Sequence, residues 1–253
     1  MCTLALAYNK HPEYPFIFIG NRDEFYKRLT EPAQFRGDIL CGLDLEKGGT
    51  WTGMSRTGRM AFITNHRNFT LHVAEPESRG LLTKNYLEGN MPAERYLKML
   101  SLRKTQFNPY NLIVGDLNGL YFYSNIEDTI IKLEAGIHGL SNALLNTPWP
   151  KVQKIKTEFS KVVFADQIEE EALFKMLENR ERANENDLPA TGLEQSLETA
   201  LSAIFIELEA YGTRHETVIL INRHGCVRFI EKFRKEDGTW ERARFEFKIT
   251  STT

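Results

Sequence analysis

Cys2 is the residue of this sequence with the most specific reactive chemistry. Removal of the initiator methionine would leave it with both a thiol and a free α-amine. An α-amine has a pKa of about 7.7–8.0, so it can act as a base near neutral pH and activate the thiol of its own residue. The competing interpretation is a small apolar residue at the start of a strand. Position 2 is therefore predicted to hold either a nucleophile or an ordinary strand residue.

Four polar residues at positions 21–24 follow the apolar run 16–19 and Gly20. The end of a buried strand holds side chains rigidly, which makes it a common place for a functional site. Arg22 could lower the pKa of a nearby thiol and hold a carboxylate substrate. In the alternative interpretation, Arg22 and either Asp23 or Glu24 form a structural ion pair.

Three further residues could contact an anion. Asn65 and Asn142 each end a strand-like segment, where an amide N–H can donate to an oxyanion, although asparagine is also common in turns. Arg214 precedes a predicted buried strand and is a second candidate anion contact. In the alternative interpretation, Arg214 is a solvated arginine without a role in a site.

The cysteines and histidines do not form a metal-binding pattern. Cys2, Cys41 and Cys226 include no CxxC pair, and the six histidines include no HExxH. We therefore expect no metal site and no disulfide framework, and a reducing compartment, the cytoplasm, is the simplest location. The absence of CxxCH excludes covalently attached c-type haem.

The composition narrows the class of protein. The 253 residues are 42% hydrophobic and 26% charged, which is typical of a globular protein, and 32 basic against 34 acidic residues give a net charge of −2. Nucleic-acid binders are usually strongly basic, so no nucleic-acid partner is expected. No apolar run reaches the roughly 18–20 residues of a membrane span, and the amino terminus lacks the pattern of a secretory signal.

Hydrophobic periodicity predicts blocks of strands separated by blocks of helices. Strands are expected at 2–8, 16–19, 51–55, 59–65, 110–117, 120–124, 129–133, 216–222, 226–233 and 240–249. Helices are expected at 78–87, 92–100, 150–163, 168–177 and 193–208, with an exposed loop at 179–192. This order favours one α+β domain over residues 1–253, with two sheets and the helices outside them.

Several segments together resemble a known family. The segments MCTLALAY, GNRDEFYKR, GGTWTGMSRTGRMAFITN, SRGLL, GLSNALLNTPWPK and YGTRHETVIL look like those of the NRDE proteins, the transport and Golgi organisation protein 2 family. That family is similar to the N-terminal nucleophile hydrolases of the choloylglycine hydrolase and penicillin V acylase type. The resemblance implies a four-layer αββα sandwich of two packed, mainly antiparallel sheets.

The resemblance also implies roles for individual residues. Cys2 would be the nucleophile with its α-amine as base, Arg22 would lie beside the thiol, Asn65 and Asn142 would form the oxyanion hole, and Arg214 would support the site. The acylases place an aspartate three residues after the arginine, whereas Asp23 follows Arg22 directly. Because adjacent residues of an extended chain point to opposite faces, Glu24 could take the role in place of Asp23.

Two functions follow from the resemblance. The first is a cysteine amidohydrolase that cleaves the amide bond of a small acyl conjugate and needs no cofactor. The second is a non-enzymatic carrier, because the family is associated with haem mobilisation, with acyl-CoA or lipid metabolism and with secretory-pathway organisation. The ligand would then be haem or an acyl-CoA or lipid, and the oligomeric state is left open.

Overall fold

The computed structural model describes residues 2–68, 70–71 and 73–250. Met1, and with it the expected removal of that residue, lies outside the described residues. The chain forms two compact units, one of residues up to Lys27 and Ala135–Glu246, the other of Arg28–Glu134 and the segment from Phe247 onward. The expectation of a single domain over residues 1–253 stays a prediction.

A six-stranded sheet forms the centre of the first unit, in the order β10-β1-β2-β11-β12-β13. Its strands are β1 (Cys2–Tyr8), β2 (Phe16–Phe25), β10 (Gly136–Leu140), β11 (Tyr211–Ile221), β12 (Cys226–Arg234) and β13 (Trp240–Lys248). The pairings from β10 to β12 are antiparallel. Both β1 and β2 therefore have a partner strand on each side, which fixes their residues in register.

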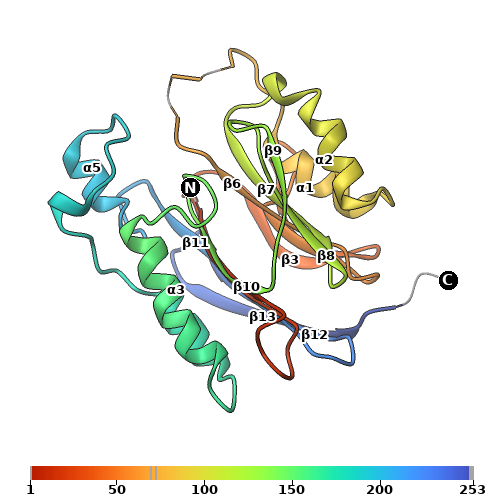
Figure 1. Ribbon diagram of the computed structural model, residues 1–253. Coiled ribbons are helices and arrows are strands. Elements are labelled where there is room, and N and C mark those ends of the chain that lie inside the picture. The colour runs from red at the N-terminus through yellow and green to blue at the C-terminus, as the bar shows by residue number, and fades with distance from the viewer. Residues whose placement is uncertain (1, 69, 72, 251–253) are drawn as a thin grey trace. The chain divides into compact units, whose positions relative to one another are not determined.

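Helices cover one face of this sheet (Figure 1). They are α3 (Pro150–Val163) and α4 (Glu170–Leu177), and the short α5 (Gln195–Ala200) follows along the chain. Ala5 and Ile19 share a buried cluster with Ile155 and Phe159 of α3 and Phe174 of α4. Because side chains alternate along a strand, even-numbered residues of β1 and β2 lie on the opposite face.

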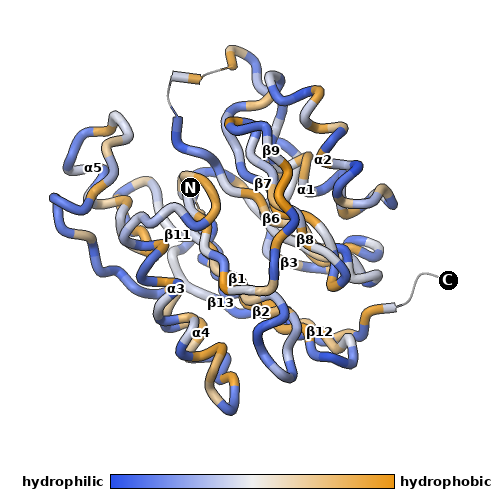
Figure 2. The backbone as a smooth tube through the Cα atoms, viewed as in Figure 1, coloured by the Kyte–Doolittle hydropathy of each residue, from blue (hydrophilic) through white to orange (hydrophobic). Residues whose placement is uncertain are grey.

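The second unit contains a seven-stranded antiparallel sheet in the order β3-β4-β5-β6-β7-β8-β9. Its strands are β3 (Thr30–Arg36), β4 (Ile39–Asp44), β5 (Thr52–Ser55), β6 (Met60–Asn65), β7 (Tyr110–Asp116), β8 (Gly119–Ser124) and β9 (Thr129–Lys132). The helices α1 (Arg79–Glu88) and α2 (Ala93–Ser101) pack on it through Tyr86 and Leu97. Figure 2 shows hydrophilic and hydrophobic residues alternating along α2, as expected of an amphipathic helix.

The predicted α+β class with two mainly antiparallel sheets is confirmed, and three local predictions are wrong. The second strand does not end at Gly20 but continues through residues 21–25. No strand is expected between residues 24 and 51, yet this segment contains β3 and β4. The helix predicted at 193–208 is limited to Gln195–Ala200, and residues 201–206 are buried without helical structure. In each case tertiary contacts override a local preference.

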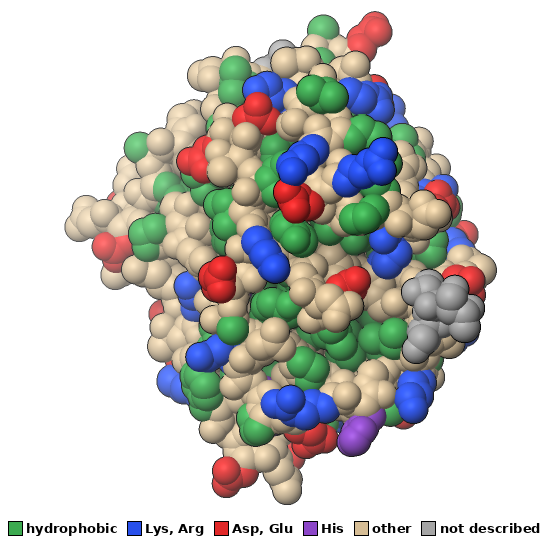
Figure 3. Space-filling view, turned by 45° about the vertical axis from the view of Figure 1, so that its right-hand side comes forward, with side chains coloured by type: hydrophobic (Ala, Val, Ile, Leu, Met, Phe, Trp, Pro, Cys, Tyr) green, Lys and Arg blue, Asp and Glu red, His purple; other side chains and the backbone are tan. Residues whose placement is uncertain are grey.

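Within the described residues, no helix is long and apolar enough to cross a membrane. Lys and Arg side chains are interspersed with Asp and Glu on the face seen in Figure 3, in keeping with a net charge of −2.

Candidate active site around Cys2

Cys2 and Arg22 are neighbours across two paired strands. Cys2 is the first residue of β1, and its Cα partner on β2 is Arg22. Directly opposed residues of an antiparallel pair share a face, with Cβ atoms about 4.5–5.5 Å apart. The guanidinium of Arg22 is 6% exposed, and its Nη2 lies 3.8 Å from Oε2 of Glu24. The predicted placement of Arg22 beside Cys2 thus has a simple origin in the strand register.

Side chains alternate between the two faces of β2, so the two acidic residues of the polar segment 21–24 point to opposite faces of the sheet. Glu24 is two residues from Arg22, on the same face, and contacts it. Asp23 is 1% exposed, and the Thr213 hydroxyl on β11 donates to its Oδ1 at 2.7 Å. Burial raises the pKa of Asp23, while Lys151, the Thr213 hydrogen bond and Arg22 oppose that rise. The carboxylate on the face of Arg22 is therefore that of Glu24.

The thiol of Cys2 is less acidic than the sequence suggested. Arg22 lowers the pKa of Cys2, as expected, but burial and the charge of Asp23 act in the other direction. Burial is the largest of these effects, and the net result is a raised pKa. The thiol is therefore protonated at neutral pH, and it needs a base before it can act as a nucleophile.

Ser141 connects Asn142 to the backbone of Cys2. The two residues follow β10, which pairs with β1. The Ser141 Oγ lies 3.0 Å from the Cys2 carbonyl oxygen and 3.2 Å from Oδ1 of the fully buried Asn142, and its single hydrogen can serve one of them at a time. The Thr3 Oγ1 lies 3.2 Å from the same hydroxyl. With the Asn142 oxygen directed at Ser141, its Nδ2 is the atom that can donate to an oxyanion.

Arg214 occupies a β-bulge inside β11. The register between β11 and β2 shifts between Thr213, which opposes Asp23, and His215, which opposes Arg22. The sequence predicts that Arg214 precedes the strand or, in the alternative, that it is solvated, and both predictions are wrong. Arg214 is 5% exposed, and its Nη1 donates to the Phe25 carbonyl at 3.4 Å. Burial and then the charge of Arg22 lower the pKa of Arg214. The bulge therefore places two arginines close enough to affect each other.

A buried pair, His215 and Glu231, lies beside Arg22 and was not foreseen from the sequence. The Nδ1 of His215 is 3.5 Å from Oε1 of Glu231, and both side chains are almost completely buried. Burial lowers the pKa of His215, against the effect of Glu231. In the sequence, the only indication of this pair is that two ionisable residues stand in otherwise apolar strands.

Asn21 and Asn65 have other surroundings. Asn21 donates from its Nδ2 to the carbonyls of Leu177 and Ile204, so it joins β2 to the segments behind the sheet. Asn65 belongs to the second unit, at the end of β6 opposite Tyr110 of β7. Its role in an oxyanion hole stays a prediction.

Sequence comparisons find a matching family model and similar proteins. The family model described as Transport and Golgi organisation 2 matches residues 1–236. The chain is 33% identical over 277 residues to the Transport and Golgi organization protein 2 homolog of Homo sapiens, covering 99% of this chain and 100% of that one. The homolog of Mus musculus is 32% identical over 284 residues, with 99% and 100% covered.

A solved structure shows a related fold. The C2A mutant of conjugated bile acid hydrolase from Clostridium perfringens gives a TM-score of 0.51 at 10% identity, with 100% of this chain and 99% of that chain covered. At such an identity the likeness concerns the fold alone.

Proposed function

The chain belongs to the Transport and Golgi organisation 2 family, and from this membership and the surroundings of Cys2 we propose that it is a cysteine amidohydrolase. The observation that carries the proposal is the pairing of Cys2 with Arg22 at the end of β1. The proposed substrate is a small acyl conjugate, in which an acyl group is joined to an amine through an amide bond. The solved relative named for conjugated bile acid hydrolysis motivates this substrate class.

The reaction would begin with processing of the chain. Removal of Met1 gives Cys2 a free α-amine, which takes the proton from the thiol of the same residue. The thiolate Sγ attacks the amide carbon, and the Nδ2 of Asn142 donates to the resulting oxyanion, with Asn65 as the predicted second donor. The intermediate collapses to a thioester, and the leaving amine takes its proton from the α-ammonium group. Water, deprotonated by the same amine, then hydrolyses the thioester.

The two arginines suggest a feature of the substrate. Arg22 and Arg214 are both permanently charged and lie close enough for each to influence the other. Glu24 contacts Arg22, so these three side chains together keep one net positive charge, which a carboxylate or another anionic group of the substrate would offset. We therefore propose acyl conjugates that carry a negative group.

The decisive experiment measures the intact mass of the purified protein and then its activity on a panel of substrates. A mass lower by one methionine is expected, together with amine release from anionic N-acyl amino acids or bile acid conjugates. Cys2→Ala should abolish release, by about 10³-fold or more, with unfolding unchanged. Cys226→Ala, at an exposed cysteine, is the matched control and should retain full activity. Retention of Met1, or an active Cys2→Ala variant, would overturn the proposed mechanism.

The family name favours a second candidate, a carrier of haem or of an acyl-CoA or lipid, because it refers to transport and not to a reaction. A carrier would bind haem or palmitoyl-CoA saturably, as followed by absorbance or by calorimetry, and Cys2→Ala would leave the affinity unchanged unless the thiol is a haem ligand. Absence of saturable binding to either compound would remove this candidate.

A further inference from the structure

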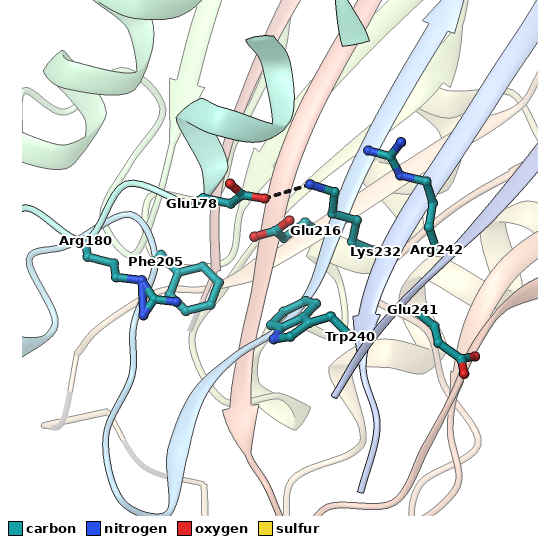
Figure 4. A pocket seen from close by; sticks show the side chains of 8 residues that line it. All are labelled: Glu178, Arg180, Phe205, Glu216, Lys232, Trp240, Glu241 and Arg242. Atoms are coloured by element: carbon teal, nitrogen blue, oxygen red, sulfur yellow. Dashed lines mark hydrogen bonds and ion pairs between the residues drawn. The ribbon is translucent and has the colours of Figure 1, made fainter. Parts of the chain in front are cut away.

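A cavity lies in the first unit, on the helix-covered face of its sheet. Its volume is about 440 Å³, which is within the size range of small-molecule sites. Figure 4 shows the carboxyl group of Glu216 between Glu178 and Trp240 in this cavity. Glu216 is on β11, opposite Asn21 of β2 and Lys232 of β12. Neither the mechanism around Cys2 nor the family membership uses this cavity.

The carboxyl group of Glu216 lacks a hydrogen-bond donor on one oxygen. Its side chain is 1% exposed, and within the described part of the chain Oε2 has no hydrogen-bond partner. The Oδ1 of Asn21, the residue opposite on β2, is in the same situation. A buried acceptor without a donor costs about 1–3 kcal/mol, so the cavity presents a group that a ligand donor would satisfy.

The other charges of the cavity wall are already neutralised. Its three cations each contact a carboxylate, namely Arg180 with Glu207, Lys232 with Glu178, and Arg242 with Glu171. The remaining wall carboxylate, Glu241, contacts Lys235 at 2.9 Å. An anionic ligand would have to displace a carboxylate from one of these cations, whereas a cation would find the acceptor of Glu216 without displacing any pair.

Two aromatic side chains line the same cavity. The rings of Phe205 and Trp240 are 5.8 Å apart at an angle of 45°, and Trp240 is 37% exposed. Aromatic faces attract cations and pack against apolar bodies. We propose that this cavity binds a small organic amine, whose ammonium group donates to Oε2 of Glu216 and whose apolar body packs against Trp240 and Phe205.

The proposal implies exchange of a proton for the ligand. Burial and the nearby carboxylate of Glu178 raise the pKa of Glu216 from 4.5 to about 8, against Lys232, Arg180 and Arg242, while β2 contributes only the uncharged Asn21. The empty site therefore holds a proton at neutral pH. Binding of an ammonium ion forms a hydrogen-bonded ion pair and releases that proton to solvent. Affinity should rise from pH 6 to pH 8.

Calorimetric titration of the full chain tests this assignment, with tryptamine as the probe and indolepropionate as its acidic counterpart. Tryptamine should bind at least about 10-fold more tightly than the acid, because its ammonium group forms an ion pair with Glu216, whereas the carboxylate of the acid can only accept a hydrogen bond from the protonated Glu216. At pH 7, titrations in buffers of different ionisation enthalpy should report release of nearly one proton per tryptamine.

Point variants test whether Glu216 and Trp240 are the residues that bind tryptamine. Glu216→Gln keeps the shape but not the charge, and it should weaken tryptamine binding by about 10-fold or more. Trp240→Ala should weaken it several-fold, whereas Glu241→Gln, on the same wall, and Cys2→Ala should have little effect. No binding of tryptamine, equal binding of the acid, or full affinity in Glu216→Gln would each overturn the proposal.

Discussion

Ser141 shows how a single hydroxyl holds the residues around a reactive cysteine. Its Oγ lies within hydrogen-bond distance of the Cys2 carbonyl, of the Asn142 amide oxygen and of Thr3 Oγ1. These atoms lie at the start of β1 and just after the end of β10, where the pairing of these two strands stops. A side chain therefore replaces the backbone hydrogen bonds that hold the rest of the two strands together.

Replacing Ser141 with alanine should lower the free energy of unfolding by about 1–3 kcal/mol, because the buried acceptors lose their shared donor. Ser160→Ala is the matched control: that hydroxyl donates to the Thr157 carbonyl on an exposed part of α3, and the expected change is below about 0.5 kcal/mol. Chemical denaturation of both variants provides the measurement. Equal stability of the two would show that the Ser141 contacts contribute little.

The bulge in β11 is the element that organises the site. It turns Thr213 toward Asp23 and His215 toward Arg22, although these two residues of β11 would share a face in a regular strand. The Thr213 hydroxyl donates to Asp23 and accepts from the Ile206 N–H at 2.9 Å. The bulge is thus fixed by one side chain that joins β2 to the segment before β11.

Thr213→Val should therefore destabilise the fold by about 2 kcal/mol or more, because a buried carboxyl and a buried N–H both lose a partner without a change in volume. Thr217→Val is the control, at a similarly buried threonine of the same strand. Its expected change is below about 0.5 kcal/mol. Thermal and urea unfolding distinguish the two, and a similar loss in both would argue against a special role of the bulge.

For the molecule as a whole, adjacent buried residues give stability opposite dependences on pH. The pKa of Glu216 is raised to about 8, so its folded form holds a proton that the unfolded chain has lost, and stability decreases as pH rises from about 4.5 to 8. The pKa of His215 is lowered, so stability decreases as pH falls below the ordinary histidine value of 6.5. The two effects oppose each other in acid, and only that of Glu216 acts above pH 6.5.

Stability should therefore fall by about 1–2 kcal/mol between pH 6.5 and pH 8, and Glu216→Gln should remove most of this fall. The measurement is urea unfolding at several pH values in the absence of amines. A variant with the same slope as the unchanged protein would mean that Glu216 is not the group that titrates.

Most strands of this protein, its family and several of its candidate site residues can be predicted from the sequence. The alternation of apolar residues predicts most strands, and the tetrapeptide at 21–24, with Cys2 and residues 140–142, points to the family and its fold. These features are local, because a period of two residues reflects the alternating burial of a strand. Cys2 and the arginines could be proposed as site residues because the chemistry of their side chains is visible in the sequence itself.

Only the tertiary structure decided how those residues are arranged. The polar end of β2 stays in the sheet because β1 and β11 flank it, and no local pattern reports a partner 190 residues away along the chain, such as Thr213 for Asp23. The pKa of Cys2 depends on burial, which outweighs the neighbouring charge that the sequence displays. The carboxyl oxygen of Glu216 that lacks a hydrogen-bond partner among the described residues becomes visible only once β11, β12 and β13 surround a common cavity. Chemistry of this kind depends on which side chains meet, and that is a property of the folded chain.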